Sequence, residues 1–204
     1  MPFERPGATP APPPNCTGVQ AKVNADDERT YTLDGDDTIV EVTGSWDSFA
    51  LANSGSSVVS SNVLGKKLDR FVSGDAALMF VRTMILSART LNRPVYRTYR
   101  CDSPELRRFM EMTVLPLGQR SVRVVHRQLY CEPVVHQVPM EGMLSAGSGN
   151  YVKRCSMCNR IRTQGIWSEA DAAVEEGRVV PSANPLKVIY GVCPDCLARP
   201  AVTL

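Results

Sequence analysis

Residues 96–112 read YRTYRCDSPELRRFMEM, and this stretch decides the fold because the chain on either side leads into it or away from it. Aromatic and β-branched residues alternate with arginine over 95–101, which is typical of a half-exposed strand. A Ser-Pro-Glu sequence at 103–105 predicts the start of a short helical turn that runs through residue 109. Residues 112–117 then predict a return strand.

The segments around this stretch predict the remaining strands and one long helix. Residues 29–33 and 38–42 flank an Asp-Gly-Asp-Asp turn and predict a hairpin, and a short helix is expected over 45–53. From 75 to 91 apolar residues recur at intervals of three and four, which predicts an amphipathic helix. A last strand is expected over 122–130. This order favours an α+β fold with a five-stranded antiparallel sheet and a helical cap on one face.

Composition limits the class of protein. The chain has 204 residues, 43% of them apolar, which allows one ordinary domain and a small one. No apolar run is long enough to span a bilayer and no signal peptide is evident, so a cytoplasmic location is expected. The net charge of +2 argues against a dedicated nucleic-acid binder. Acidic residues gather before residue 50 and arginines between 82 and 127, which predicts pairing within the fold or between copies, or else an anion-binding face.

Three segments resemble the bacterial PAS domain: IVEVTGSWDSFALANSG at 39–55, VLGKKLDRFVSG at 63–74 and YRTYRCDSPELRRFMEMTVLPL at 96–117. The resemblance covers residues 29–133. It implies a sensor module that consists of a hairpin, a helical cap and a three-strand return. Such a module holds a small ligand or cofactor between sheet and helices, and often pairs into a homodimer.

The resemblance does not identify the ligand. The chain lacks the NCRFLQ-like flavin-attachment motif of photosensing members. Its two histidines, His126 and His136, lie outside the long helix where haem-binding members carry a ligand, so both are expected to be structural. Large apolar residues of this region would line a ligand pocket, or would form ordinary core. They are Trp46, Phe49, Leu68, Phe71, Phe80 and Met84.

Seven cysteines, an odd number without a secretory signal, argue against a disulfide framework. Three of them, Cys16, Cys101 and Cys131, are expected to be buried or incidental thiols. The other four form two Cys-x-x-Cys pairs near the C-terminus. They are Cys155, Cys158, Cys193 and Cys196.

The two cysteine pairs predict a structural zinc site. A two-residue spacer lets both thiolates of a pair reach one tetrahedral ion, and two pairs complete four ligands with no open position. The ion would then supply most of the stability of a small module. Thiol redox chemistry is an alternative, and a transcription-related zinc protein is another. A catalytic zinc is less well supported, because no histidine or acid is placed to act as a base.

The segment around these pairs predicts a small zinc-ribbon-like module. A strand and turn are expected over 161–167, a helix over 168–177 and a strand over 186–192. The pattern CSMCNRIRTQGIW, EEGRV and VIYGVCPDC resembles a cysteine module at the end of some bacterial sensory proteins. Tyr190 stands where that module often has histidine, and all four cysteines are retained.

We therefore expect a disordered proline-rich tail at 1–24, a PAS-like sensor domain at 25–137, a linker at 138–150 and a zinc-binding module at 151–204. The chain contains no Gly-rich phosphate loop, nucleophile elbow or kinase signature. These features favour a non-enzymatic sensory or regulatory adaptor. Its expected partners are a signalling protein and a second copy of the chain, without membrane or nucleic acid.

Overall fold

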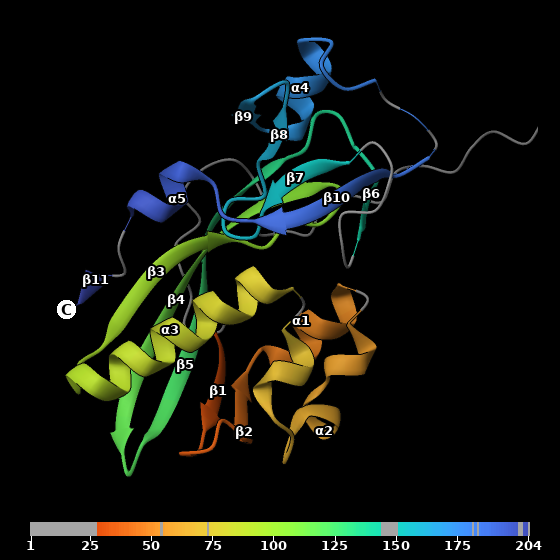
Figure 1. Ribbon diagram of the computed structural model, residues 1–204. Coiled ribbons are helices and arrows are strands. Elements are labelled where there is room, and N and C mark those ends of the chain that lie inside the picture. Colours follow the sequence, from red (N-terminus) through yellow and green to blue (C-terminus); the bar gives the residue numbers. More distant parts are fainter. Residues whose placement is uncertain are drawn as a thin grey trace, which may run out of the picture.

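The computed structural model describes residues 28–53, 55–72, 74–143, 151–180, 182 and 184–199, together with the backbone of 202–203. The tail predicted at 1–24 and the thiol of Cys16 lie outside these residues. The described chain forms two sheets, one of them covered by helices (Figure 1).

The first sheet has six strands in the order β11-β3-β4-β5-β1-β2, and every neighbouring pair is antiparallel. Five of its strands were predicted, and the sixth, from the C-terminal end of the chain, was not. The antiparallel sheet of the predicted α+β fold is therefore confirmed. The strands are β1 (Arg29–Leu33), β2 (Ile39–Gly44), β3 (Val95–Arg100), β4 (Leu106–Gly118), β5 (Ser121–Pro133) and β11 (Val202–Thr203).

One face of this sheet is covered by α1 (Trp46–Ala52), α2 (Ser60–Val63) and α3 (Asp75–Leu91), with 3₁₀ turns at Ser56–Val58 and Leu68–Phe71 (Figure 1). The longest helix, α3, begins and ends where its apolar period predicts. Gly74 (φ 87°) precedes it, and Asn92 in the left-handed region (φ 48°) ends it. None of the described helices is long and apolar enough to cross a membrane.

The core lies between α3 and the sheet. Met84, Ile85 and Ala88 of α3 are fully or almost fully buried, in one cluster with Val114 of β4 and Val124 of β5. These three helix positions share one face, because residues three and four apart lie side by side on a helix. Burial of this face fixes α3 on the sheet.

The helical turn predicted from residue 103 through 109 is wrong. Leu106 already begins β4, whose side chains alternate between buried and half-exposed as in a strand. The loop before it is closed locally: the Ser103 N–H donates to the Leu106 carbonyl at 2.9 Å, and the Arg108 N–H donates to Asp102 Oδ1 at 3.1 Å. Ser, Pro and Asp favour tight turns as well as helix starts, and here the turn joins two long strands.

The second sheet has the order β6-β10-β7-β8-β9. Both β6 and β7 run parallel to β10, whereas β7, β8 and β9 are antiparallel neighbours. Since β6 falls within the segment expected to be a linker, part of that segment belongs to the second sheet. The elements of this part are β6 (Met140–Gly142), β7 (Val152–Cys155), β8 (Ile161–Thr163), β9 (Ile166–Ser168), α4 (Ala170–Glu175), β10 (Leu186–Gly191) and α5 (Pro194–Ala198).

Two methionines of α3 offer a matched test of this packing. Met84 is 1% exposed, whereas Met79 is 62% exposed on the outer side of the same helix. Met84→Ala should lower the free energy of unfolding by about 2–5 kcal/mol, because it leaves a cavity in the core. Met79→Ala should change it by less than about 0.5 kcal/mol. Urea unfolding measures both, and an equal loss in the two variants would contradict the assigned core face.

Candidate metal centre and its contacts with the first sheet

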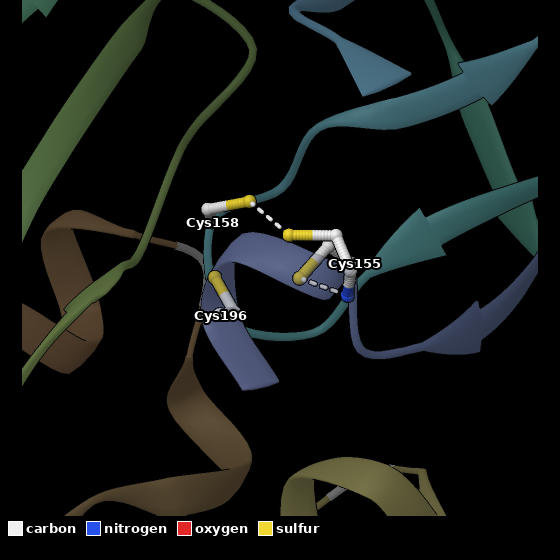
Figure 2. A group of neighbouring side chains, drawn as sticks. Cys155, Cys158 and Cys196 are labelled. Atoms are coloured by element: carbon white, nitrogen blue, oxygen red, sulfur yellow. Dashed lines mark hydrogen bonds between the residues drawn. The ribbon is translucent and has the colours of Figure 1, made fainter. Parts of the chain in front are cut away.

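The structure brings the four predicted cysteines together. Cys155 ends β7 and Cys158 lies in the turn after it, while Cys193 immediately precedes α5 and Cys196 lies within it. All four Sγ atoms lie within 4.8 Å of one another. Figure 2 shows Cys155 and Cys158 facing Cys196 of α5. Three of the four side chains are buried and that of Cys158 is half-buried.

The geometry of the cluster suits one tetrahedral ion. With metal–sulfur bonds of about 2.3 Å, the sulfurs of such a site are about 3.8 Å apart. The Sγ atoms of Cys158 and Cys193 are separated by 3.7 Å. In addition, Cys155 Sγ accepts the backbone N–H groups of Met157 and Cys193, each at 3.4 Å. Because such N–H groups favour the thiolate form and orient it, the cluster can hold a metal ion.

Repulsion between the sulfurs limits how many thiolates the cluster can hold without a cation. The hydrogen bond with Cys155 and then the Arg160 guanidinium lower the pKa of Cys158 to about 4. Burial, followed by the charge of Cys158, raises the pKa of Cys196 to about 12. The hydrogen bond with Cys158, followed by burial, raises the pKa of Cys155. One thiolate therefore forms at the expense of its neighbours, and a divalent cation would remove this limit by replacing their protons.

Arg160 is a member of the site that the sequence analysis missed. Its Nε donates to Cys158 Sγ at 3.3 Å, and its Nη2 lies 3.6 Å from Cys193 Sγ and 2.6 Å from Asp195 Oδ2. Four thiolates around a divalent ion leave a net negative charge, which this guanidinium partly offsets. The only sequence signal was an arginine two residues after the first cysteine pair.

The second cysteine pair opens a short helix, which the sequence analysis did not anticipate. Cys193 is the N-cap residue of α5, a position that redox-active cysteines often occupy. The strand that follows α5, however, joins the first sheet, so no βαβ unit surrounds the pair. All four cysteines are free thiols that converge on one point, which favours a shared ion over two separate dithiols.

The two cysteines of the described chain that lie outside the cluster differ from each other. Cys101 is a half-buried free thiol, as predicted, and burial raises its pKa. Cys131 on β5 is disulfide-bonded, so the expectation of an incidental thiol there is wrong.

Both cysteine pairs are hydrogen-bonded to β3. The Arg100 N–H donates to the carbonyl of Met157, between the first two cysteines, at 2.8 Å. The Arg97 guanidinium donates to the carbonyl of Cys196. Phe80 and Tyr99 pack both against the sulfur cluster and against the core of the first sheet. The cysteine cluster is therefore attached directly to the edge of the first sheet.

Partly buried ion pairs reinforce this attachment. Arg100 donates twice to Asp102, at 2.8 Å each, and also contacts Glu169 Oε1 at 3.2 Å. Arg107 pairs with Asp171 and approaches Glu169 Oε2 at 3.7 Å. Since Glu169 and Asp171 flank the start of α4, these contacts join the hairpin of β3 and β4 to the second sheet.

The expected pairing of the early acids with the central arginines is present elsewhere in the fold. Arg89 contacts Asp37 at 2.7 Å, and Arg123 contacts Glu41 at 3.7 Å. Arg100 and Arg107 instead use acids of the C-terminal part of the chain, together with Asp102 and Glu132. Some arginines of 82–127 thus pair with acids near the N-terminal hairpin, and others pair with acids of the C-terminal part.

The residues predicted to line a ligand pocket are not all in one place. Leu68 and Met84 are buried in the core, and Trp46, Phe71 and Phe80 pack at its edge. Phe49 lies apart, with the Arg29 guanidinium 4.3 Å above its ring and that of Arg108 at 5.8 Å. Phe80 also borders the sulfur cluster.

His126 lies inside the fold, as expected for a structural residue. Its Nδ1 is hydrogen-bonded to the Tyr99 hydroxyl at 2.8 Å, and the ring of Tyr31 is 5.6 Å away. Burial, and secondarily the charge of Arg29, lowers the pKa of His126 to about 4, so the imidazole is neutral. His136 is exposed, with Nε2 3.8 Å from Glu175. Neither histidine belongs to the sulfur cluster.

Comparisons with known proteins give little further information. No family model matches the chain, and no curated protein matches it. Among solved structures, a domain of an HTR-like protein from Haloarcula marismortui ATCC 43049 is similar to part of the chain. It covers 50% of this chain and 98% of its own, at 15% identity and a TM-score of 0.39. A TM-score this low does not support a shared fold or function.

The two histidines provide a test by pH. An unfolded histidine has a pKa near 6.5, so below that pH the unfolded state binds a proton that native His126 does not. Between pH 7 and 5 this group alone should lower the free energy of unfolding by about 2 kcal/mol. Urea unfolding at both pH values should show that loss shrinking in His126→Gln and persisting in His136→Gln. A smaller loss in His136→Gln, or an unchanged one in His126→Gln, would contradict the assignment.

Proposed function

We propose that this protein is a non-enzymatic, cytoplasmic sensory or regulatory adaptor. In this proposal a PAS-like domain carries a zinc-stabilised module, and the two act by binding a protein partner of a signalling pathway. The observation that carries the proposal is the convergence of four cysteine sulfurs within 4.8 Å, attached to the edge of the first sheet.

The donor set favours zinc with a structural role. Four thiolates in tetrahedral arrangement are typical of zinc or of iron–sulfur sites, and a single shared ion fits a cluster with a sulfur–sulfur distance of 3.7 Å. Four protein ligands leave no position for a catalytic water, so the ion would bind, hold and orient the two loops. All four cysteines of the cluster are free thiols and are therefore available as ligands.

The first sheet and its helices support the PAS-like sensor role. An antiparallel sheet of six strands, five of them from residues 29–133, is covered on one face by α1, α2 and α3, the arrangement in which that family holds small ligands. The inner face also contains a polar pair, Tyr99 and His126, next to the apolar core. Association into a homodimer is part of this proposal, on the family resemblance alone.

Tyr99 provides a route between the sensor core and the metal module. Its hydroxyl is hydrogen-bonded to half-buried His126, while its ring packs against the sulfur cluster. Phe80 of α3 makes the corresponding contact from the helix side. A ligand or partner that shifts α3 against the sheet would therefore change how the module is held.

A thiol-redox protein is the second candidate. One observation favours it: Cys193 caps the start of α5 in a Cys-Pro-Asp-Cys sequence. Two separate redox pairs would react reversibly with oxidants, whereas a metal-bound set of four would be protected. The two candidates therefore differ in metal content and thiol reactivity.

Metal analysis with thiol alkylation separates them. The native protein should contain one zinc per chain, and an alkylating reagent should modify the four cluster cysteines only after a chelator is added. Cys193→Ser should lose the zinc, because one of four ligands is removed, while Cys101→Ser should keep it. Protein without metal, whose cysteine pairs form disulfides reversibly, would overturn the zinc assignment in favour of redox chemistry.

A further inference from the structure

One edge of β3 is covered by the C-terminal part of the chain. The other edge pairs with β4 over all six residues of β3. The Cys101 N–H donates to the backbone carbonyl of Arg108 on β4, whereas the Arg100 N–H points the other way and donates to the backbone carbonyl of Met157. Because successive amides of a strand point to opposite sides, the Tyr96 amide points to the same edge as that of Arg100. There Tyr96 pairs with β11.

Each contact that covers this edge comes from a residue close to a cysteine of the cluster. Met157 lies between Cys155 and Cys158, and the carbonyl bonded to Arg97 belongs to Cys196. The strand β11 starts six residues after Cys196. An ion that holds the four sulfurs therefore also holds the residues that cover β3, and its loss would free all of them together.

Arginines of β3 and of its neighbour β4 contact this cover. Arg97 is bonded to the Cys196 carbonyl, Arg107 to Asp171, and Arg100 in part to Glu169. If the module leaves, these three arginines lose partners beside a strand whose outer N–H and C=O groups become available. An exposed strand edge is a template for pairing with another extended chain.

We propose that the metal-bound module is a removable cover of the β3 edge, and that the uncovered edge binds an extended acidic segment of a partner protein. The inference rests on the metal centre of the proposed function. Charge selects the partner: its carboxylates would replace Glu169 and Asp171 beside Arg100 and Arg107, and the Cys196 carbonyl beside Arg97. A second copy of β3 would bring Arg97 and Arg100 of the two copies together, and repulsion between like charges makes this unfavourable.

Amide hydrogen exchange on the full chain, with and without chelator, tests the cover. After the zinc is removed, the amides of Tyr96 and Arg100 should exchange at least about tenfold faster, while that of Val124 in the central strand β5 stays protected. Unchanged protection of Tyr96 and Arg100 in metal-free protein would overturn the cover. Equal loss of protection at Val124 would also overturn it, because the module would then not be separable from the sheet.

Fluorescence anisotropy tests the partner. The probe is a labelled ten-residue peptide of alternating Glu and Val, with a Lys and Val peptide as control. Metal-free protein should bind the Glu peptide at least about tenfold more tightly than metal-loaded protein does, and more tightly than it binds the Lys peptide. Arg97→Gln with Arg107→Gln should weaken that binding, whereas Arg123→Gln, on β5, should not.

Other outcomes overturn specific parts of the inference. Equal binding of the Glu peptide by both forms, or no preference over the Lys peptide, would overturn the acidic partner. If light scattering gave metal-free protein twice the mass of metal-loaded protein, the segment that binds the uncovered edge would be a second copy of the chain and not an acidic partner. If the native protein contains one zinc but amide exchange at the β3 edge does not change after chelation, the cover is refuted and the proposed function stands. If the native protein contains no bound metal, the proposed function itself is refuted.

Discussion

Four cysteine sulfurs within 4.8 Å of one another impose the constraint on which the C-terminal part of the fold, with the second sheet, depends. Without a metal ion the four thiols cannot all lose their protons, because the thiolates would repel one another. The pKa of Cys158 is therefore lowered, while those of Cys155 and Cys196 are raised. A divalent ion would resolve this conflict by replacing the protons of all four thiols at once, which leaves a net negative charge on the site. The guanidinium of Arg160 then offsets part of the remaining negative charge.

The same constraint reaches the first sheet through β3. The second sheet has a small core of its own, in which Ile161, Ala173 and Val179 are the buried members of one cluster. Structural zinc in small modules contributes about 10 kcal/mol, more than a core of this size supplies. Phe80 and Tyr99 pack against both the core of the first sheet and the cysteine cluster, so the stability of the metal centre and that of the first sheet are linked.

The sequence was most informative where one short-range rule decides the structure. The three- and four-residue period located α3 to the residue, and the Asp-Gly-Asp-Asp turn located the hairpin of β1 and β2. The spacing of the cysteines located the cluster. At residues 103–109 the same Ser-Pro-Glu signal suits a turn and a helix, and only the pairing of β3 with β4 decides between them. Long-range contacts, such as β6 with β10, β11 with β3 and Arg160 with two sulfurs, carry no local signal.

X-ray absorption at the zinc edge of the native protein tests the central claim most directly, since it reports the atoms bound to the ion. A first shell of four sulfurs at about 2.3 Å is predicted for an ion held by Cys155, Cys158, Cys193 and Cys196. A shell that contains nitrogen or oxygen, fewer than four sulfurs, or no zinc absorption at all would contradict a four-cysteine centre that holds the module on β3.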